Sequence, residues 1–391
     1  MKKAKRLGKV PPYLFMEISR LKAKVMAEGR DIIDLGIGDP DQPTPEPIVD
    51  KLCEVAREAE YHRYDESEAG CPALMETAAR WYKKRFDVDI DPDTETVLLI
   101  GSIDGLAHLC WTLIDPGDIS LVPDPGYTVY RVNTLMAGGE PVPMPLLEKN
   151  NFLPDLTAIP TDTAKAARLM FVNYPNNPTG AVADLDFYRD VVDFARQYDI
   201  AVCSDLAYSE VTYDGYSAPS ILQVPGSKDF CIEMNTLSKT YNMTGWRIGF
   251  GVGNSELVAA LNDLKTNVDS RQFQPIGLAA AYALENVSNK SMLDLYSKRR
   301  DILVDGLNAL GWNLKKPKAS LYVWAKVPER YTSSEFAKLL LNEAGVLVIP
   351  GNSYGEYGEG YVRMALTVLG DNDGDRITEA VSRIKSMKLK F

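Results

Sequence analysis

Short apolar runs alternate with longer stretches of helical periodicity through the middle of the chain. The apolar runs are four or five residues long and cover residues 96–100, 119–122, 169–172, 200–203, 230–234 and 248–252. Stretches with apolar residues at helical spacing separate most of them, at 103–113, 126–136, 184–198 and 255–265. Continuous apolar runs of this length indicate strands buried on both faces, and intervening helices are typical of parallel pairing. The pattern therefore predicts an α/β domain around a mostly parallel sheet.

The pattern differs on both sides of this region. The pattern at residues 13–24 predicts a short amphipathic helix. Further helices are expected to begin at Thr44-Pro45 and at Pro72, because proline is favoured in the first helical turn. After Pro275 the predicted elements are helices at 276–286 and 291–310, a strand at 321–327, a helix at 333–344, strands at 346–349 and 361–365, and a C-terminal helix. This order indicates a second, α+β domain, for which a chain of 391 residues is long enough.

The charge balance narrows the range of partners. The chain has 43 basic and 54 acidic side chains, a net charge of −11, which disfavours binding to a nucleic-acid backbone or an anionic membrane. No apolar run is long enough to span a bilayer. The basic run Lys2–Arg6 is followed by Pro11-Pro12 rather than by an apolar signal segment. We therefore expect a soluble, cytoplasmic protein without nucleic-acid or membrane partners.

The histidines and cysteines exclude some kinds of site and indicate the compartment. With only His62 and His108 available, a histidine-based metal site or a Ser-His-Asp triad is disfavoured, and no metal is expected. The cysteines show no paired spacing and mostly lie in apolar segments, which predicts free thiols in a reducing compartment. They are Cys53, Cys71, Cys110, Cys203 and Cys231.

The most informative candidate for chemistry is a lysine that follows a predicted strand. Lys239 comes after the run at 230–234, with hydroxyls at Thr236 and Ser238 beside it and Arg247 eight residues further on. An amine on a rigid strand end can form a Schiff base with an aldehyde, while hydroxyls and a guanidinium can bind a phosphate dianion. The set therefore suits a phosphorylated aldehyde, although a lysine after a strand is more often a solvated loop residue.

Other predicted strands also end in polar or aromatic residues, and ligands of open α/β sheets bind at this edge. Ser102 stands where a strand passes into a helix, which suits either an anion or an ordinary capping turn. Tyr127 offers a flat surface for a ring, or is a packed aromatic. Asn177 lies in the proline-rich segment Asn173–Gly180, where an amide directed into a site competes with simple turn chemistry.

A carboxylate completes this set. Asp205 closely follows the run at 200–203 and is expected to be half buried, which costs free energy unless the charge is paired. A helix N-cap would explain it, but so would a protonated ring nitrogen, which this carboxylate would keep charged as an electron sink. Tyr208, three residues on, could reach the hydroxyl of the same ring. Each residue is ambiguous by itself, but the ordered set at successive strand ends is not.

Together these residues resemble those of the pyridoxal-phosphate-dependent aminotransferases of the aspartate aminotransferase superfamily, fold type I, over nearly the whole chain. The matching residues are Ser102, Tyr127, Asn173–Gly180, Asp205, Tyr208, Thr236, Ser238, Lys239, Arg247 and Arg363. The resemblance implies a large domain with a mixed, mostly parallel seven-stranded sheet flanked by helices, and a smaller α+β domain built from both chain ends. The expected division is an N-terminal arm and part of the small domain at 1–45, the large domain at 46–285 and the small domain at 286–391. It also implies a homodimer with shared active sites.

The resemblance further implies a role for each residue, with pyridoxal 5′-phosphate as the cofactor. Lys239 would form the Schiff base and move a proton between the substrate Cα and the cofactor. The expected cofactor contacts are Asp205 to the ring nitrogen, Asn177 and Tyr208 to the ring hydroxyl, Tyr127 to the ring face, and Ser102, the Ile103 N–H, Thr236, Ser238 and Arg247 to the phosphate, with Tyr64 reaching the phosphate of the partner subunit. The expected substrate contacts are Tyr13, the Gly38 backbone, Asn177 and Arg363.

The N-terminal motif narrows the resemblance to a subgroup. Tyr13 and the string Asp34–Pro45 are most similar to LL-diaminopimelate aminotransferases, which exchange nitrogen between LL-diaminopimelate or tetrahydrodipicolinate and glutamate or 2-oxoglutarate in lysine synthesis. Ile103 departs from the pattern, because the best-known members carry a lysine there. The alternatives are an alanine, aromatic or broad-specificity amino-acid aminotransferase, or a lyase or decarboxylase with the same cofactor. A DNA-binding regulator built on this fold is disfavoured by the acidic charge and by the first motif beginning at Tyr13.

Overall fold

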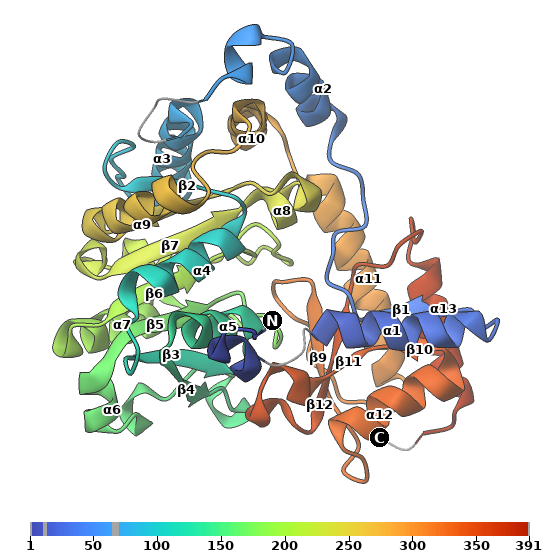
Figure 1. Cartoon of the computed structure of the whole chain (residues 1–391). Coiled ribbons are helices and arrows are strands. Elements are labelled where there is room, and N and C mark those ends of the chain that lie inside the picture. The colour runs from blue at the N-terminus through green and yellow to red at the C-terminus, as the bar shows by residue number, and fades with distance from the viewer. Residues whose placement is uncertain (1, 11–13, 65–69, 390–391) are drawn as a thin grey trace.

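The computed structural model describes residues 2–10, 14–64 and 70–389, and they form a larger and a smaller body (Figure 1). The larger body contains a seven-stranded sheet of order β2-β8-β7-β6-β5-β3-β4, in which β8 is antiparallel to both neighbours and the remaining pairs are parallel. Its strands are β2 Thr96–Leu99, β3 Ile119–Asp124, β4 Glu140–Pro145, β5 Ala167–Asn173, β6 Ala201–Asp205, β7 Cys231–Thr236 and β8 Gly249–Gly253. The mixed, mostly parallel sheet expected from the sequence is confirmed.

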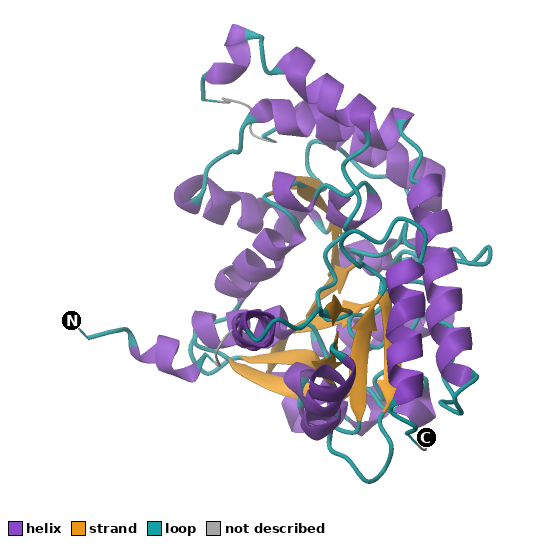
Figure 2. Cartoon of the chain, turned by 90° about the vertical axis from the view of Figure 1, so that its right-hand side faces the viewer, coloured by secondary structure: helices purple, strands orange, loops and turns teal. Residues whose placement is uncertain are grey.

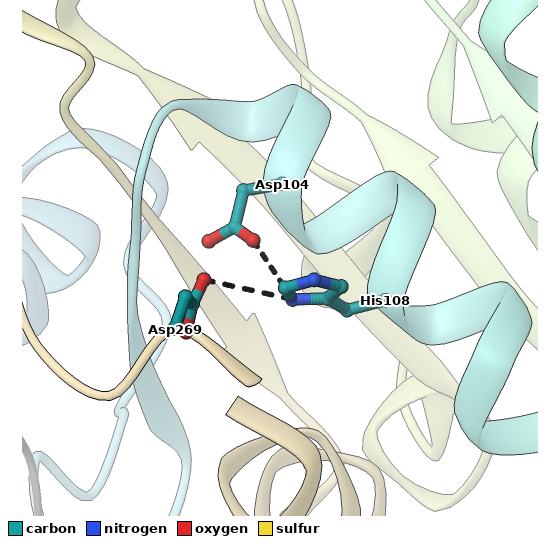
Figure 3. Close-up of side chains that lie close together, drawn as sticks. All are labelled: Asp104, His108 and Asp269. Atoms are coloured by element: carbon teal, nitrogen blue, oxygen red, sulfur yellow. Dashed lines mark ion pairs between the residues drawn. The ribbon is translucent and has the colours of Figure 1, made fainter. Parts of the chain in front are cut away.

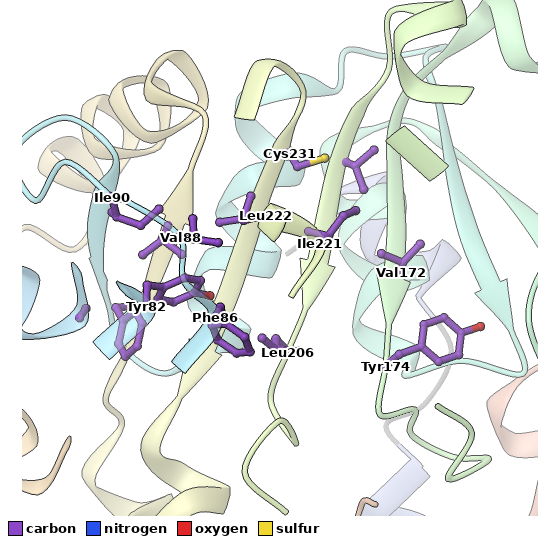
Figure 4. Packing of buried hydrophobic residues seen from close by; sticks show 14 of the residues in the cluster. Tyr82, Phe86, Val88, Ile90, Val172, Tyr174, Leu206, Ile221, Leu222 and Cys231 are labelled. Atoms are coloured by element: carbon purple, nitrogen blue, oxygen red, sulfur yellow. The ribbon is translucent and has the colours of Figure 1, made fainter. Parts of the chain in front are cut away.

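Helices cover both faces of this sheet (Figure 2). One face packs against α4 Ser102–Leu113, α5 Thr128–Ala137 and α9 Ser255–Val268, and the other against α3 Pro72–Phe86, α7 Leu185–Tyr198 and α10 Gln274–Asn286. Neighbouring strand residues point into opposite cores: Val202 belongs to the core shown in Figure 4 and Cys203 to the core on the far side. Each buried Val- or Leu-sized side chain contributes about 1.5–3 kcal/mol, so both layers hold the sheet rigidly.

The smaller body combines the two ends of the chain. A three-stranded antiparallel sheet has the order β11-β12-β9, and β1 of the N-terminal segment pairs in parallel with β10. The elements are α1 Leu14–Ala27, β1 Ile33–Asp34, α11 Lys290–Asn308, β9 Tyr322–Lys326, α12 Ser333–Leu339, β10 Val346–Leu347, β11 Ile349–Pro350, β12 Tyr361–Ala365 and α13 Asp375–Ser386. A small domain that uses both chain ends therefore fits the structure, while its boundaries at residues 45 and 285 stay a prediction.

The direction of the strands determines what gathers at one edge of the large sheet. The parallel strands β5, β6 and β7 end side by side, and Asn173 lies opposite Asp205 in the register. Because β8 runs the other way, its first residue Gly249 pairs with Thr236 at the end of β7. Arg247, just before β8, therefore lies at the same edge as the residues that follow β7.

The sequence patterns missed β4 and the short α6 Thr161–Ala166. The β4 strand reads Glu-Pro-Val-Pro-Met-Pro, and three prolines in six residues argue against a strand in the interior of a sheet. This strand lies at the edge, where it pairs only with β3, so its prolines need to donate no hydrogen bond on the open side. The remaining helices of the large body are α2 Glu46–Val55 and the one-turn α8 Leu237–Thr240.

Two compositional expectations can be compared with the structure. All five cysteines are free, and only Cys53 is exposed. None of the helices in the described part of the chain has the length and apolarity that crossing a bilayer requires.

Candidate active site

A cavity of about 360 Å³ opens at the carboxyl edge of the large sheet, where the two bodies meet. Nearly all the site residues predicted from the sequence line it. The lining residues are Ile37, Gly38, Asp39, Ser102, Ile103, Tyr127, Asn173, Asn177, Asp205, Ala207, Tyr208, Thr236, Ser238, Lys239, Thr244, Arg247, Tyr322 and Arg363. Residues from eight regions of the sequence thus converge on one space that is large enough for a small molecule.

The lysine at the centre of the cavity lies on α8, the helical turn that follows β7. The hydroxyl of Thr236 accepts a hydrogen bond from the Ser238 N–H and caps this turn. Lys239 Nζ donates a hydrogen bond to the carbonyl oxygen of Gly38 at 2.9 Å. Burial lowers the pKa of Lys239, and the nearby guanidinium groups of Arg363 and Arg247 lower it further. A lowered pKa makes the neutral amine more accessible, which suits a nucleophile and a general base.

The carboxylate of Asp205 lies at the end of β6 and is 4% exposed. It accepts hydrogen bonds from Tyr130 Oη at 2.8 Å and from the Ala207 N–H at 3.2 Å. Within the described residues no basic side chain forms an ion pair with it, and burial raises its pKa to about 6. A buried carboxylate of this kind has a strong electrostatic preference for a cationic partner in the cavity.

Hydroxyls, a guanidinium and a helix end meet on another side of the cavity. Ser102 is the first residue of α4, and the hydroxyls of Thr236 and Ser238 hydrogen-bond to each other at 2.9 Å. Arg247 donates to the Thr244 carbonyl at 2.8 Å. A Cβ on Gly101 would lie 2.3 Å from Arg247 Nη2, so the guanidinium rests directly against the N-cap of α4. The N–H groups of a helix start, two hydroxyls and an arginine are well suited to bind a dianion.

A second arginine stands at the wall that the smaller body provides. Arg363 of β12 is fully buried, and donates to Asn177 Oδ1 at 2.8 Å and to the Gly36 carbonyl at 2.6 Å. Its guanidinium carbon lies 4.0 Å from the ring centroid of Tyr322 and 5.0 Å from that of Tyr354. Its Nε has no hydrogen-bond partner among the described residues. In the described part of the chain no carboxylate pairs with this planar group, which could bind one in bidentate fashion.

Tyr322 and Tyr130 make contacts in this region that the sequence patterns did not indicate, and Asn173 makes one that they did not assign to it. Tyr322 places its hydroxyl 3.0 Å from that of Tyr208 and fills the space above Gly38, where a Cβ would lie 2.1 Å from the Tyr322 oxygen. Tyr130 donates to Asp205 from the apolar face of α5. Asn173 belongs to the segment singled out from the sequence, and its amide donates to the Asp205 carbonyl at 2.8 Å. Tyr322 and Tyr130 look like ordinary core aromatics in the sequence, so no local signal marks them.

Two predicted site residues are not part of the cavity. Tyr64 is 96% exposed and does not line it; its expected contact involves a second subunit and stays a prediction. Tyr13 lies outside the described residues.

Fold and cavity together define a class of protein. The chain belongs to the class I and II aminotransferases, whose family model matches residues 30–384. It is 53% identical to an LL-diaminopimelate aminotransferase of Moorella thermoacetica and 50% identical to one of Halothermothrix orenii, with 100% of both chains covered in each comparison. The solved substrate-bound BacF structure from Bacillus subtilis superimposes with a TM-score of 0.95 at 37% identity, covering 100% of this chain and 99% of that one. The protein is therefore an aminotransferase that acts on amino acids and oxo acids.

Proposed function

We propose that this chain is a pyridoxal-phosphate-dependent LL-diaminopimelate aminotransferase. The observation that carries the proposal is the identity of 50% or more, over the full length of both chains, to relatives of that name. In this reaction one amino group of LL-2,6-diaminopimelate moves to 2-oxoglutarate and yields glutamate. The remaining oxo acid closes on its distal amine with loss of water and gives tetrahydrodipicolinate. The reaction belongs to lysine synthesis, and the free thiols fit an enzyme of the reducing cytoplasm.

The residues of the cavity fit the cofactor. The buried, unpaired carboxylate of Asp205 would hold a protonated pyridine nitrogen, and the anion-binding end beside Arg247 would hold the phosphate. When bound, the cofactor supplies a carbonyl that accepts the amino group and a protonated ring that takes up negative charge from the substrate Cα. The other expected contacts are Tyr127 to the ring face, Asn177 and Tyr208 to the ring hydroxyl, and Ser102, the Ile103 N–H, Thr236 and Ser238 to the phosphate.

The remaining chemistry falls to two basic side chains. The Lys239 amine, with its lowered pKa, removes the proton from the substrate Cα and returns it on the opposite leg of the reaction. Arg363 binds the substrate α-carboxylate and so fixes which Cα bond faces the lysine. Asn177, whose Oδ1 accepts from Arg363, holds the guanidinium in place for this contact.

A homodimer would complete the site. Tyr64 is almost fully exposed in the single chain, as expected if its hydroxyl reaches the phosphate of the partner subunit. Mixing inactive Lys239→Ala protein with Tyr64→Ala protein should restore part of the activity, because one site of the mixed dimer then has both native residues. Activity that stays at the sum of the two separate variants would contradict shared sites.

The substrate is tested with a panel of amino donors. With 2-oxoglutarate as acceptor, LL-diaminopimelate should give the highest kcat/KM, above meso-diaminopimelate, alanine and the aromatic amino acids. The formation of glutamate reports each rate. A higher kcat/KM with alanine or an aromatic amino acid would instead assign the chain to those transaminases, and release of carbon dioxide without glutamate would indicate a decarboxylase.

The cofactor and the lysine are tested on the purified protein. Bound pyridoxal phosphate should colour it yellow, and reduction with borohydride followed by mass spectrometry should place the added mass on Lys239. Lys239→Ala should abolish transamination while still taking up the cofactor. Lys290→Ala is the matched control, since this lysine pairs with Asp294 on the surface. Full activity of Lys239→Ala would rule out the proposed base.

A further inference from the structure

A buried cluster of charged side chains lies directly behind the first turn of α4. Asp104 is the third residue of that helix, and its Oδ2 accepts hydrogen bonds from the Ile100 N–H at 2.8 Å and from Lys265 Nζ at 2.5 Å. Lys265 is 3% exposed and also contacts Asp269 Oδ2 at 3.0 Å. Nδ1 of His108 lies 2.8 Å from Asp104 Oδ1. Figure 3 shows Asp104 and His108, one turn apart on α4, facing Asp269 just after α9.

The cluster is next to the proposed phosphate site but is not part of the cavity. Ser102 and Ile103 line the cavity, and Asp104 follows them in the same helical turn without lining it. A carboxylate at this place would repel a phosphate dianion bound to the helix start, because buried charges are poorly screened by solvent. Since position 103 is an isoleucine, the first turn itself supplies no cationic side chain to offset that repulsion.

The charge state of the cluster follows from its contacts. Burial by itself would raise the pKa of Asp104, but His108 and the ammonium of Lys265 lower it to about 2, so the carboxylate is ionised at neutral pH. Asp104, His108 and Asp269 are close enough to ligate a metal ion. The Lys265 ammonium already lies between the two carboxylates, however, and takes the place that such a cation would have.

We propose that Lys265 is a positioning residue for the cofactor phosphate. Its ammonium cancels the charge of Asp104 behind the helix start, and this leaves the N–H groups of Ser102 and Ile103 free to attract a dianion. The hydrogen bond that Asp104 accepts from Ile100 meanwhile keeps the turn closed. The inference rests on the proposed binding of pyridoxal phosphate, and it concerns the phosphate rather than the ring.

The test compares two ligands that differ only in the phosphate. Cofactor-free wild type, Lys265→Met and the double variant Asp104→Asn/Lys265→Met are titrated with pyridoxal phosphate and with pyridoxal, and binding is followed by absorbance. Lys265→Met should bind pyridoxal phosphate about tenfold or more weakly, because an uncompensated carboxylate then faces the dianion. Its affinity for pyridoxal should not change. The double variant should recover the affinity of the wild type for pyridoxal phosphate.

Two further variants keep the test decisive. Asp269→Asn is the matched control: it removes the other carboxylate on Lys265 but leaves the ammonium on Asp104, so it should not weaken pyridoxal phosphate binding. If Lys265→Met does not fold, Asp104→Asn alone should bind pyridoxal phosphate at least as tightly as the wild type. Equal weakening for both ligands, no weakening in Lys265→Met, or weaker binding by Asp104→Asn would overturn the inference. A wild type that binds pyridoxal phosphate no better than pyridoxal would instead contradict the proposed cofactor.

Discussion

The hydroxyl oxygens of Tyr208 and Tyr322 lie 3.0 Å apart and connect the two bodies of the molecule across the cavity. Tyr208 follows the end of β6 in the large sheet, and Tyr322 begins β9 in the small sheet. The ring of Tyr322 also lies under the Arg363 guanidinium, and its hydroxyl fills the space above Gly38. The Gly38 carbonyl in turn accepts the hydrogen bond from Lys239. One side chain that the sequence did not single out therefore contacts Tyr208, Arg363 and Gly38.

Two substitutions of Tyr322 should separate its ring from its hydroxyl. Tyr322→Phe keeps the ring beneath Arg363, so the KM for 2-oxoglutarate should change little, while loss of one hydrogen bond of about 1 kcal/mol lowers kcat by about fivefold. Tyr322→Leu also removes the cation–π contact of about 0.5–2 kcal/mol, which should raise KM by about 2- to 30-fold. Steady-state kinetics measures both. Equal KM values in the two variants would show that the ring does not support the guanidinium.

Replacing Arg363 by lysine should reveal the importance of the planar fork. The lysine keeps the positive charge but cannot bind a carboxylate with two parallel hydrogen bonds, so kcat/KM should fall by about 10²-fold, mainly through KM. The absorbance of the bound cofactor should stay the same. Arg330→Lys is the control, because Arg330 also lies over a tyrosine ring, that of Tyr331 at 5.0 Å, but on the surface. An unchanged KM for both the amino donor and the oxo acid would remove Arg363 from the substrate site.

The sequence predicts most of the cavity because most of it follows from strand direction. Asn177, Asp205 and Lys239 lie at or just after the ends of parallel strands, whose carboxyl ends necessarily meet at one edge. Their convergence therefore needs no knowledge of tertiary contacts. The position of Arg247 at this edge also follows from strand direction, since the antiparallel β8 begins where β7 ends.

The residues that were missed depend on contacts between distant parts of the chain. Tyr322 meets Tyr208 across 114 positions, and Tyr130 meets Asp205 across 75. Both tyrosines also occupy buried positions of regular elements, so their local pattern is that of core residues. The contact predicted for Tyr64 stays a prediction, because it involves a second subunit and a single chain contains only one side of it.

A pair of glycine variants should show how tightly the anion-binding end of the cavity is packed around Arg247. Gly101 has φ +74°, and a Cβ there would lie 2.3 Å from Arg247 Nη2. Gly215 has the same φ of +74° but nothing within 4 Å of its Cβ position. Alanine should strain the backbone at both sites by about 1–3 kcal/mol, measured by urea unfolding, and Gly101, with ψ 159°, lies in a region that is essentially restricted to glycine. Only Gly101→Ala should also weaken pyridoxal phosphate binding, because its methyl group displaces the guanidinium. Equal cofactor affinity in the two variants would contradict the close contact.

The buried carboxylate of Asp205 makes a prediction about stability as a function of pH. Burial raises its pKa from an ordinary value of 3.8 to about 6. Below about pH 4 the group is protonated in both the folded and the unfolded chain, so it brings no penalty. As the pH rises to 6 the unfolded chain releases the proton first, and above pH 6 the folded chain holds an unpaired buried charge that costs about 3 kcal/mol.

The cofactor-free wild type should therefore lose stability relative to Asp205→Asn as the pH rises from 4 to 7. Urea unfolding of both proteins at several pH values measures the difference, and the near-isosteric amide serves as the reference that does not titrate. Pyridoxal phosphate should abolish the pH-dependent part of the difference, because the protonated ring nitrogen then pairs with the carboxylate. Asp205→Asn should also lower kcat by about 10²- to 10³-fold, since an amide does not hold that proton on the ring. A stability difference that is constant with pH would mean that the carboxylate already has a cationic partner in the free protein.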